Sequence, residues 1–150
     1  MVDLIILPAV IIGAVIGFYE LMLIHQDENF RGSHWLIHGF QAAFFCILFV
    51  LATMNVDYLV QLIPAMQNWG FFGSPLMIRL IIGIIAIFRI QASSAVVRGH
   101  TGMGGGLAAR GMREHFIHTF IVAALIVAAP YMYNAFLINI IPNSFGGLGS

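Results

Sequence analysis

The sequence predicts an all-α integral membrane protein, a bundle of four transmembrane helices with short loops that forms a single domain over residues 1–150. Only 8% of its residues are charged and 61% are hydrophobic. A soluble domain has about 25% charged residues, which give it a hydrated surface. The mean hydropathy of the chain is +0.98. Apolar stretches of about 20 residues recur, and this is the length that crosses the hydrocarbon core of a bilayer.

The first two spans are expected over residues 4–24 and 34–54. The first opens with Asp3 instead of a basic region, so we interpret it as a membrane helix and not as a signal peptide. Gly13 and Gly17 form a GxxxG step, which lets helix backbones approach closely in lipid. Tight packing within the bundle and a seam between two copies both remain open for this step.

The segment after the second span, residues 56–67, has spaced apolar residues interrupted by Pro64. It predicts either an extension of the second helix or a short interfacial helix. Trp69, Phe71 and Phe72 then suit the aromatic belt of a membrane interface. The third span is expected over residues 76–97 and the fourth over 114–141. The fourth is longer than a straight span needs, and Pro130 should bend it by removing one backbone hydrogen bond.

The arginines predict the orientation in the membrane. The loops after the first and third spans hold Arg31, Arg98, Arg110 and Arg113, whereas the other side has only Arg79. The positive-inside rule therefore places the Arg- and His-bearing loops in the cytoplasm and both termini outside. The partner expected from composition is the lipid bilayer. No nucleic-acid partner is expected, because the chain has no polybasic run.

Polar side chains gather at the end of the bundle that we place in the cytoplasm, because the first and third helices end where the second and fourth begin. The residues concerned are Glu20, His25, Asp27, Glu28, His34, His38, His100, Glu114, His115 and His118. At about 1.5 Å per residue, Glu20, His38 and His118 should lie roughly 6 Å inside the same interface. Gln41, Arg89 and Gln91 should lie deeper on the second and third spans.

This band of polar residues predicts an ion path or gate, because charged groups at such depth are costly and usually face the bundle interior or a water-filled cavity. Arg89 needs an anionic partner there, and Glu20 is the carboxylate at a suitable depth. We therefore predict an ion pair between the first and third helices, which either fixes their packing or gates the path. The candidate path residues are Glu20, Arg89, Gln41, Gln91, Asp27 and Glu28.

The same end also carries the histidine spacing of a helical metal site. His34 and His38 are four residues apart, His115 and His118 are three apart, and Glu114 is four before His118. Imidazole and carboxylate groups in this arrangement are ligands for zinc, iron or copper. A haem held between His38 and His118, interfacial histidines with a structural role, and pH sensing are the alternatives.

Transport is the function that these patterns favour first. We expect an oligomeric ion channel or transporter whose pore forms at a symmetry axis between copies, with acidic residues that attract cations. An accessory subunit of a larger membrane complex is the second interpretation. A membrane metalloprotein, acting as an enzyme, is the third.

Overall fold

The computed structural model describes residues 4–26, 34–95 and 116–141. Every regular element within these ranges is helical, which confirms the predicted all-α class for the described part of the chain. In order they are α1 (Leu7–Gln26), α2 (His34–Met54), α3 (Val56–Leu62), the 3-10 segment η2 (Pro64–Gly73), α4 (Pro75–Ala95), α5 (Phe116–Met132) and the π-helical turn η4 (Tyr133–Leu137).

Two described helical segments, Pro75–Ala92 and Phe116–Leu137, are long and apolar enough to cross a membrane. A third candidate is the bent pair Gly39–Met54 and Val56–Leu62, whose two helices differ in direction by 71°. The apolar helices therefore support a protein inserted in a membrane. A count of four spans, with α1 as the first, stays a prediction.

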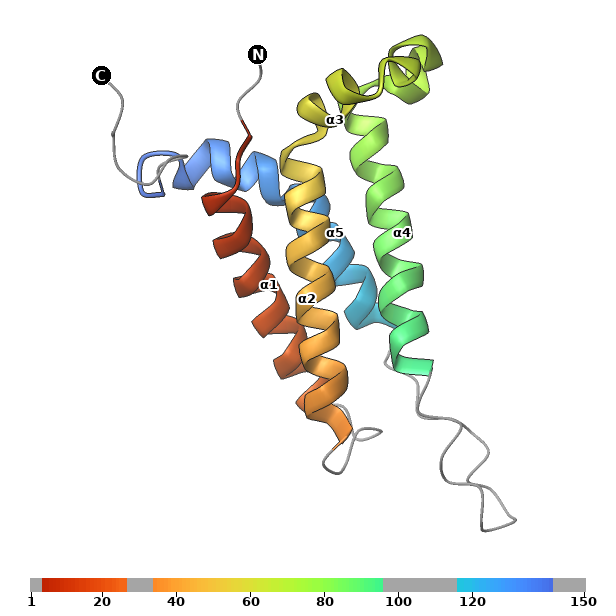
Figure 1. Cartoon of the computed structure of the whole chain (residues 1–150). Coiled ribbons are helices and arrows are strands. Elements are labelled where there is room, and N and C mark those ends of the chain that lie inside the picture. The colour runs from red at the N-terminus through yellow and green to blue at the C-terminus, as the bar shows by residue number, and fades with distance from the viewer. Residues whose placement is uncertain (1–3, 27–33, 96–115, 142–150) are drawn as a thin grey trace.

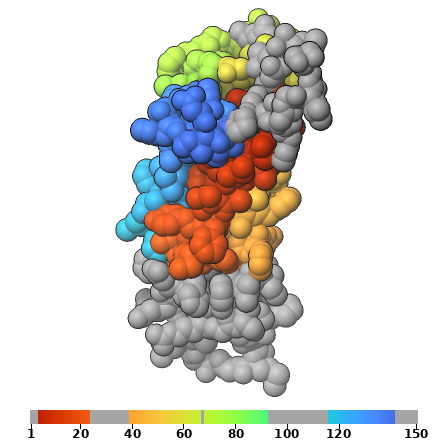
Figure 2. All heavy atoms as spheres, turned by 90° about the vertical axis from the view of Figure 1, so that its left-hand side faces the viewer, coloured from red at the N-terminus to blue at the C-terminus, as the bar shows by residue number. Residues whose placement is uncertain are grey.

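The long helices α1, α2, α4 and α5 stand beside one another as a bundle (Figure 1). α2 and α5 contact each other, and each also contacts α1 and α4, so α1 and α4 occupy the outer positions. From the side, Figure 2 shows α1 between α5 and α2. The helix directions match the predicted arrangement, because α1 and α4 end at the end of the bundle where α2 and α5 begin.

The GxxxG step packs inside the bundle, against α2. A Cβ atom added at Gly13 would lie 2.6 Å from the Cα of Ile47, and one at Gly17 would lie 2.8 Å from the Cα of Ala43. Real Cβ atoms do not approach backbone so closely, so a larger side chain at either glycine would push the two helices apart. The small residues thus allow backbone contact between α1 and α2.

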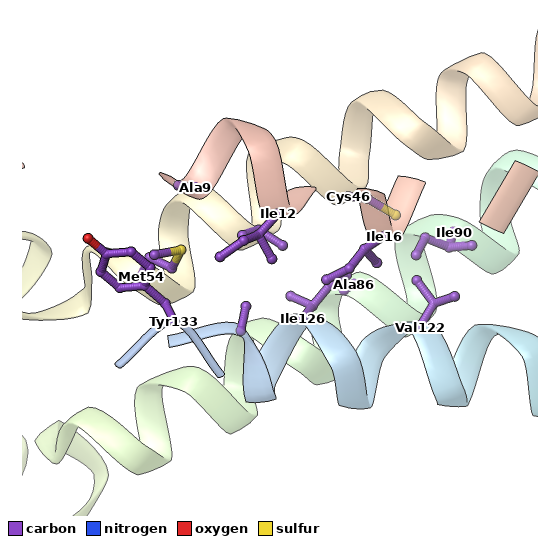
Figure 3. Close-up of a cluster of buried hydrophobic side chains, with 12 residues drawn as sticks. Ala9, Ile12, Ile16, Cys46, Met54, Ala86, Ile90, Val122, Ile126 and Tyr133 are labelled. Atoms are coloured by element: carbon purple, nitrogen blue, oxygen red, sulfur yellow. The ribbon is translucent and has the colours of Figure 1, made fainter. Parts of the chain in front are cut away.

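Aliphatic side chains from all four long helices fill the core (Figure 3). Its buried members include Ile12, Ile16, Cys46, Val50, Ala86, Ile90, Val122 and Ile126. The outer faces are also apolar, with Phe18, Phe88 and Phe120 more than half exposed at 62%, 70% and 57%. Exposure of such large apolar faces to water would be unfavourable, whereas lipid chains can cover them. The pattern is therefore typical of a membrane protein.

Pro130 lies inside α5, as predicted, and the helical path continues through η4 to Leu137. Figure 1 shows this C-terminal part turning away from the bundle axis. A proline has no N–H, so Pro130 leaves the carbonyl of Ile126 without its usual helical donor. The hydroxyl of Thr53 on α2 donates to that carbonyl at 3.0 Å. The bond that α5 loses is thereby replaced by one between two helices.

The segment between α2 and α4 is neither a straight extension of α2 nor a single helix. α3 departs from α2 at 71°, and η2 follows it with a reversal at Gly70, where φ is 57°. Both project from the bundle at the end where α4 begins (Figure 1). Trp69, Phe71 and Phe72 are exposed there, as an aromatic belt requires, and their depth in a membrane stays a prediction.

Candidate functional site

The most unusual side chain in the described core is Glu20, which is 0% exposed. Both of its carboxylate oxygens are buried. Glu20 follows Ile16 by four residues, so it shares the face of α1 that packs into the core. It lies six residues before Gln26, the last residue of α1, so it is about 9 Å from that end of the helix, measured along the helix axis. Burying an ionisable group inside a membrane domain costs free energy, so Glu20 is a candidate functional residue.

A hydrogen bond joins α4 and α5 at the same end of the bundle. The Nε2 of Gln91 donates to the Oγ1 of Thr119 at 2.7 Å, and Thr119 is fully buried. Gln91 lies four residues before Ala95, the end of α4, and Thr119 three residues after Phe116, the start of α5. Gln91 was among the predicted path residues, whereas Thr119 was missed, although its depth beside His118 was visible in the sequence.

His118 is the one predicted metal ligand whose side chain the structure describes. It is partly buried on α5, and its Nδ1 atom is fully buried. The side chains of His34 and His38, and all of Glu114 and His115, lie outside the described residues. Within the described side chains, no group of three or more His, Cys, Asp or Glu is placed to hold a metal. The metal site and the haem alternative therefore stay predictions.

Arg89 lies on the outer surface of the bundle and not in its core. Its guanidinium carbon is 4.6 Å from the ring centroid of Phe45 on α2, in cation–π contact. Gln41, one turn before Phe45 on α2, is also exposed. The predicted ion pair between Glu20 and Arg89 stays a prediction, since the two residues belong to the outer helices α1 and α4. The predicted path residues Asp27 and Glu28 lie outside the described residues.

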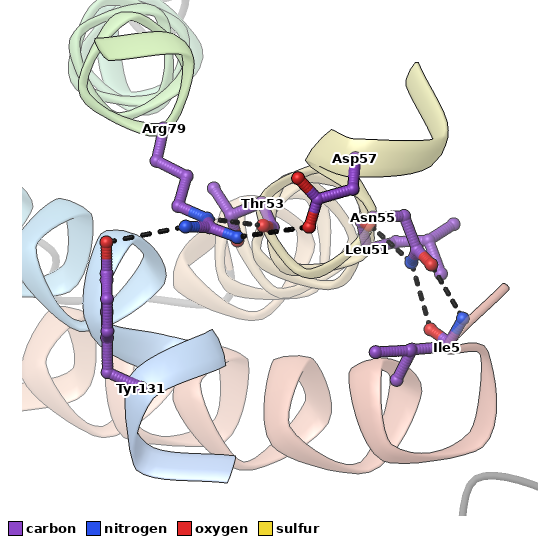
Figure 4. A network of polar contacts seen from close by, with 7 residues as sticks. All are labelled: Ile5, Leu51, Thr53, Asn55, Asp57, Arg79 and Tyr131. Carbon is purple, nitrogen blue, oxygen red and sulfur yellow. Dashed lines mark hydrogen bonds and ion pairs between the residues drawn. The ribbon is translucent and has the colours of Figure 1, made fainter. Parts of the chain in front are cut away.

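A second polar cluster lies at the opposite end, where α2 bends into α3 (Figure 4). Arg79 of α4 is at its centre. Its Nε donates to the backbone oxygen of Thr53 at 3.1 Å, and its Nη1 donates to the Oη of Tyr131 at 3.4 Å. Its Nη2 forms an ion pair with the Oδ2 of Asp57 at 3.9 Å. One guanidinium therefore connects α4 with α2, α3 and α5.

Asn55 lies at the bend itself and ties it to the start of α1. Its Oδ1 accepts the N–H of Ile5 at 2.6 Å, and its Nδ2 donates to the backbone oxygen of Ile5 at 2.9 Å. The same Nδ2 also donates to the oxygen of Leu51 at 2.8 Å. The carbonyls in the last turn of a helix lack helical donors. Arg79 supplies such a donor to the carbonyl of Thr53 where the helical path breaks, and the side chain of Asn55 adds a second donor to the carbonyl of Leu51, which also accepts the backbone N–H of Asn55.

The sequence contained a signal for this second cluster. Asp57 is the single acidic residue between the second and third spans, and Arg79 is the fourth residue of the third predicted span. Their opposite charges could have been matched across the break. The two polar clusters lie at opposite ends of the bundle, and only the first holds a fully buried ionisable group among the described residues. No protein-family model, curated protein or solved structure matches the chain.

Proposed function

We propose that the chain is a small ion-translocating membrane protein, a channel or transporter that works as a homo-oligomer. Glu20 is the group that binds the transported proton or cation. The observation that carries this proposal is the complete burial of the Glu20 carboxylate in a bundle whose core is otherwise mostly apolar. Ionisable residues inside membrane domains commonly belong to ion pathways and proton relays.

The chemistry of a buried carboxylate supports this role. Away from water, a carboxyl group is stable when it is protonated, or when its charge is balanced by a bound cation, a charged partner or several hydrogen-bond donors. Exchange of a proton or cation at such a group is the elementary step of ion translocation. The hydrogen bond between Gln91 and Thr119 adds neutral dipoles at the same end of the bundle, where they can help to solvate a passing ion.

The proposal includes four membrane spans, with α1 and α2 crossing alongside α4 and α5. α1 has 20 residues and α2 has 21, so at about 1.5 Å per residue each is about 30 Å long, the thickness of a bilayer core. The arginine bias places the loops that follow α1 and α4 in the cytoplasm. An antibody should then label an epitope at either terminus from outside intact cells. Labelling that occurs only after the cells are permeabilised would show that the orientation is the opposite one.

Polar groups on the outer surface support a contact between copies. Gln41 of α2 and Arg89 of α4 are exposed on the isolated chain, although both lie within long apolar helices. Polar side chains that face lipid at such depth are costly, and contact with another helix lowers that cost. A symmetric oligomer would cover these groups with the same face of another copy.

Flux into proteoliposomes tests the assignment of Glu20. Wild-type protein should carry protons, or Na⁺ or K⁺, down an imposed gradient. Glu20→Gln keeps the shape of the side chain but carries no negative charge and takes up no proton near neutral pH, so it should strongly reduce the flux, while Glu20→Asp should retain part of it. Phe18→Leu is the matched control, at an exposed position of α1 two residues before Glu20, and it should keep the flux. Wild-type vesicles without flux of any of these ions would refute the transport function. Normal flux through Glu20→Gln would refute the role of Glu20.

A further inference from the structure

An apolar groove runs between α4 and α5 on the outside of the bundle, with a volume of about 410 Å³. Along α5 its lining residues extend from Phe120 to Tyr131, and across it lie Ile84 and Ile87 of α4. The eleven-residue separation of Phe120 and Tyr131 corresponds to a length of about 16 Å. This is about half of the roughly 30 Å hydrocarbon core, the depth of one lipid leaflet.

In the proposed membrane arrangement the groove faces hydrocarbon, because its two walls belong to the two helical segments that are long and apolar enough to cross a membrane. Its volume is within the range of about 300–1,000 Å³ that is usual for small-molecule sites. An occupant that matches this shape and environment is a single acyl chain lying along the helices.

Two oppositely charged side chains, Arg79 and Asp57, lie next to each other at the Tyr131 end of the groove. The hydroxyl of Tyr131 accepts from Arg79 at 3.4 Å, and Arg79 is only four residues, about 6 Å, inside the start of α4. The Oδ2 of Asp57 lies 3.9 Å from the Nη2 of Arg79, which is longer than a hydrogen bond. The side chain of Asp57 is 57% exposed, whereas that of Arg79 is 13% exposed and already contacts Thr53 and Tyr131. Asp57 can therefore receive a further partner directly, and Arg79 can receive one only at the small exposed edge of its guanidinium, where N–H groups remain beyond those used in these contacts.

We propose that this groove binds one phospholipid with a phosphate and a primary ammonium in its headgroup, of the ethanolamine type. One acyl chain fills the groove, the phosphate accepts from the guanidinium of Arg79, and the ammonium donates to Asp57. Arginine matches the geometry of phosphate oxygens, and an ammonium carries three donors for a carboxylate. A purely anionic headgroup would be repelled by Asp57, and a quaternary ammonium has no N–H to donate to it.

Lipid retention tests the headgroup preference. The full chain is reconstituted in vesicles that contain equal parts of ethanolamine, glycerol and choline phospholipids with identical acyl chains. It is then extracted in mild detergent and examined by native mass spectrometry. One ethanolamine lipid per chain should be retained, with about a tenfold preference, the factor expected from one charge-assisted hydrogen bond. Retention of the three lipids in the proportions supplied would overturn the proposal.

Two substitutions separate the groove from the headgroup site. Ala124→Phe fills the groove from an exposed lining position and should remove the retained lipid. Ala14→Phe, at an exposed position on α1, is the matched control and should keep it. Asp57→Asn should leave a lipid bound but abolish the preference for ethanolamine over glycerol headgroups. Equal lipid retention by the two phenylalanine variants would exclude the groove. An unchanged preference in Asp57→Asn would exclude the headgroup assignment.

Discussion

The hydrogen bond from Thr53 to the carbonyl of Ile126 should contribute measurably to stability, and Thr53→Val tests it. Valine has nearly the same shape as threonine but lacks the hydroxyl. In the wild type that hydroxyl lies 3.0 Å from the oxygen of Ile126 and 3.1 Å from the oxygen of Val50. Val50 lies within α2 and keeps the helical donor four residues later, at Met54. Ile126 has no such donor, because the residue four positions later is Pro130.

The expected cost is therefore that of one hydrogen bond to a buried carbonyl. Side-chain hydrogen bonds between membrane helices contribute about 0.6 kcal/mol on average and up to about 1.7 kcal/mol. The carbonyl of Ile126 has lost its helical donor, which places this bond toward the upper half of that range. We expect Thr53→Val to lower the free energy of unfolding by about 1 kcal/mol.

The proline supplies a specific control. Pro130→Ala restores an N–H at position 130, which can donate to Ile126 within α5. The hydroxyl of Thr53 then becomes dispensable, so Thr53→Val should cost much less in the Pro130→Ala background. A double-mutant cycle measured by reversible unfolding in mixed micelles should give a coupling energy of about 1 kcal/mol. If Thr53→Val costs the same in both backgrounds, Pro130 and Thr53 are independent and our account of this interface is wrong.

Three further predictions concern the helix contacts and the polar cluster at the bend. Gly13→Leu should destabilise the bundle by about 1–3 kcal/mol in the same unfolding assay, because its Cβ would meet the backbone of Ile47. Wild-type stability would show that α1 can move away freely. Asn55→Leu removes both partners of the Ile5 backbone, so hydrogen exchange of the Ile5 amide should accelerate about tenfold. An unchanged exchange rate would mean that Asn55 does not hold the start of α1. Arg79→Lys should cost about 1.5 kcal/mol, since one ammonium cannot reproduce the separate contacts of a planar guanidinium. A lysine variant as stable as the wild type would show that only the positive charge of Arg79 matters, and not the geometry of its guanidinium.

The positions of most long helices along the chain were predictable, because the hydrophobicity of a stretch of about 20 residues depends on its composition and not on contacts with other helices. The second span was predicted over residues 34–54, and α2 covers His34–Met54. The third was predicted over 76–97, and α4 covers Pro75–Ala95. The fourth was predicted to reach residue 141, whereas α5 ends at Met132 and η4 at Leu137. Hydrophobicity continues past the end of the helix there, so composition alone does not show where the helix ends, and the limit of the span at residue 141 stays a prediction.

For the candidate site, the sequence predicted how far along its helix each residue lies, but not whether its side chain faces the core or the outer surface. The spacing along α1 placed Glu20 near one end of the bundle, and the structure shows that it is completely buried. The same reasoning placed Arg89 and Gln41 in that band, yet both are exposed. Helices that are apolar on every side give no amphipathic signal of which face turns inward, so side-chain direction depends on packing between helices.

The sequence by itself determined that this chain forms apolar helices, where they begin within a few residues, and at which ends their polar groups lie. These properties follow from local composition, proline positions and helical rise. Only the tertiary structure decided which groups meet. It packed Gly13 and Gly17 against α2, directed Thr53 to the carbonyl released by Pro130, and joined Arg79 to Asp57 across the bend. These contacts connect residues that are far apart in the chain, and they depend on how the helices pack together.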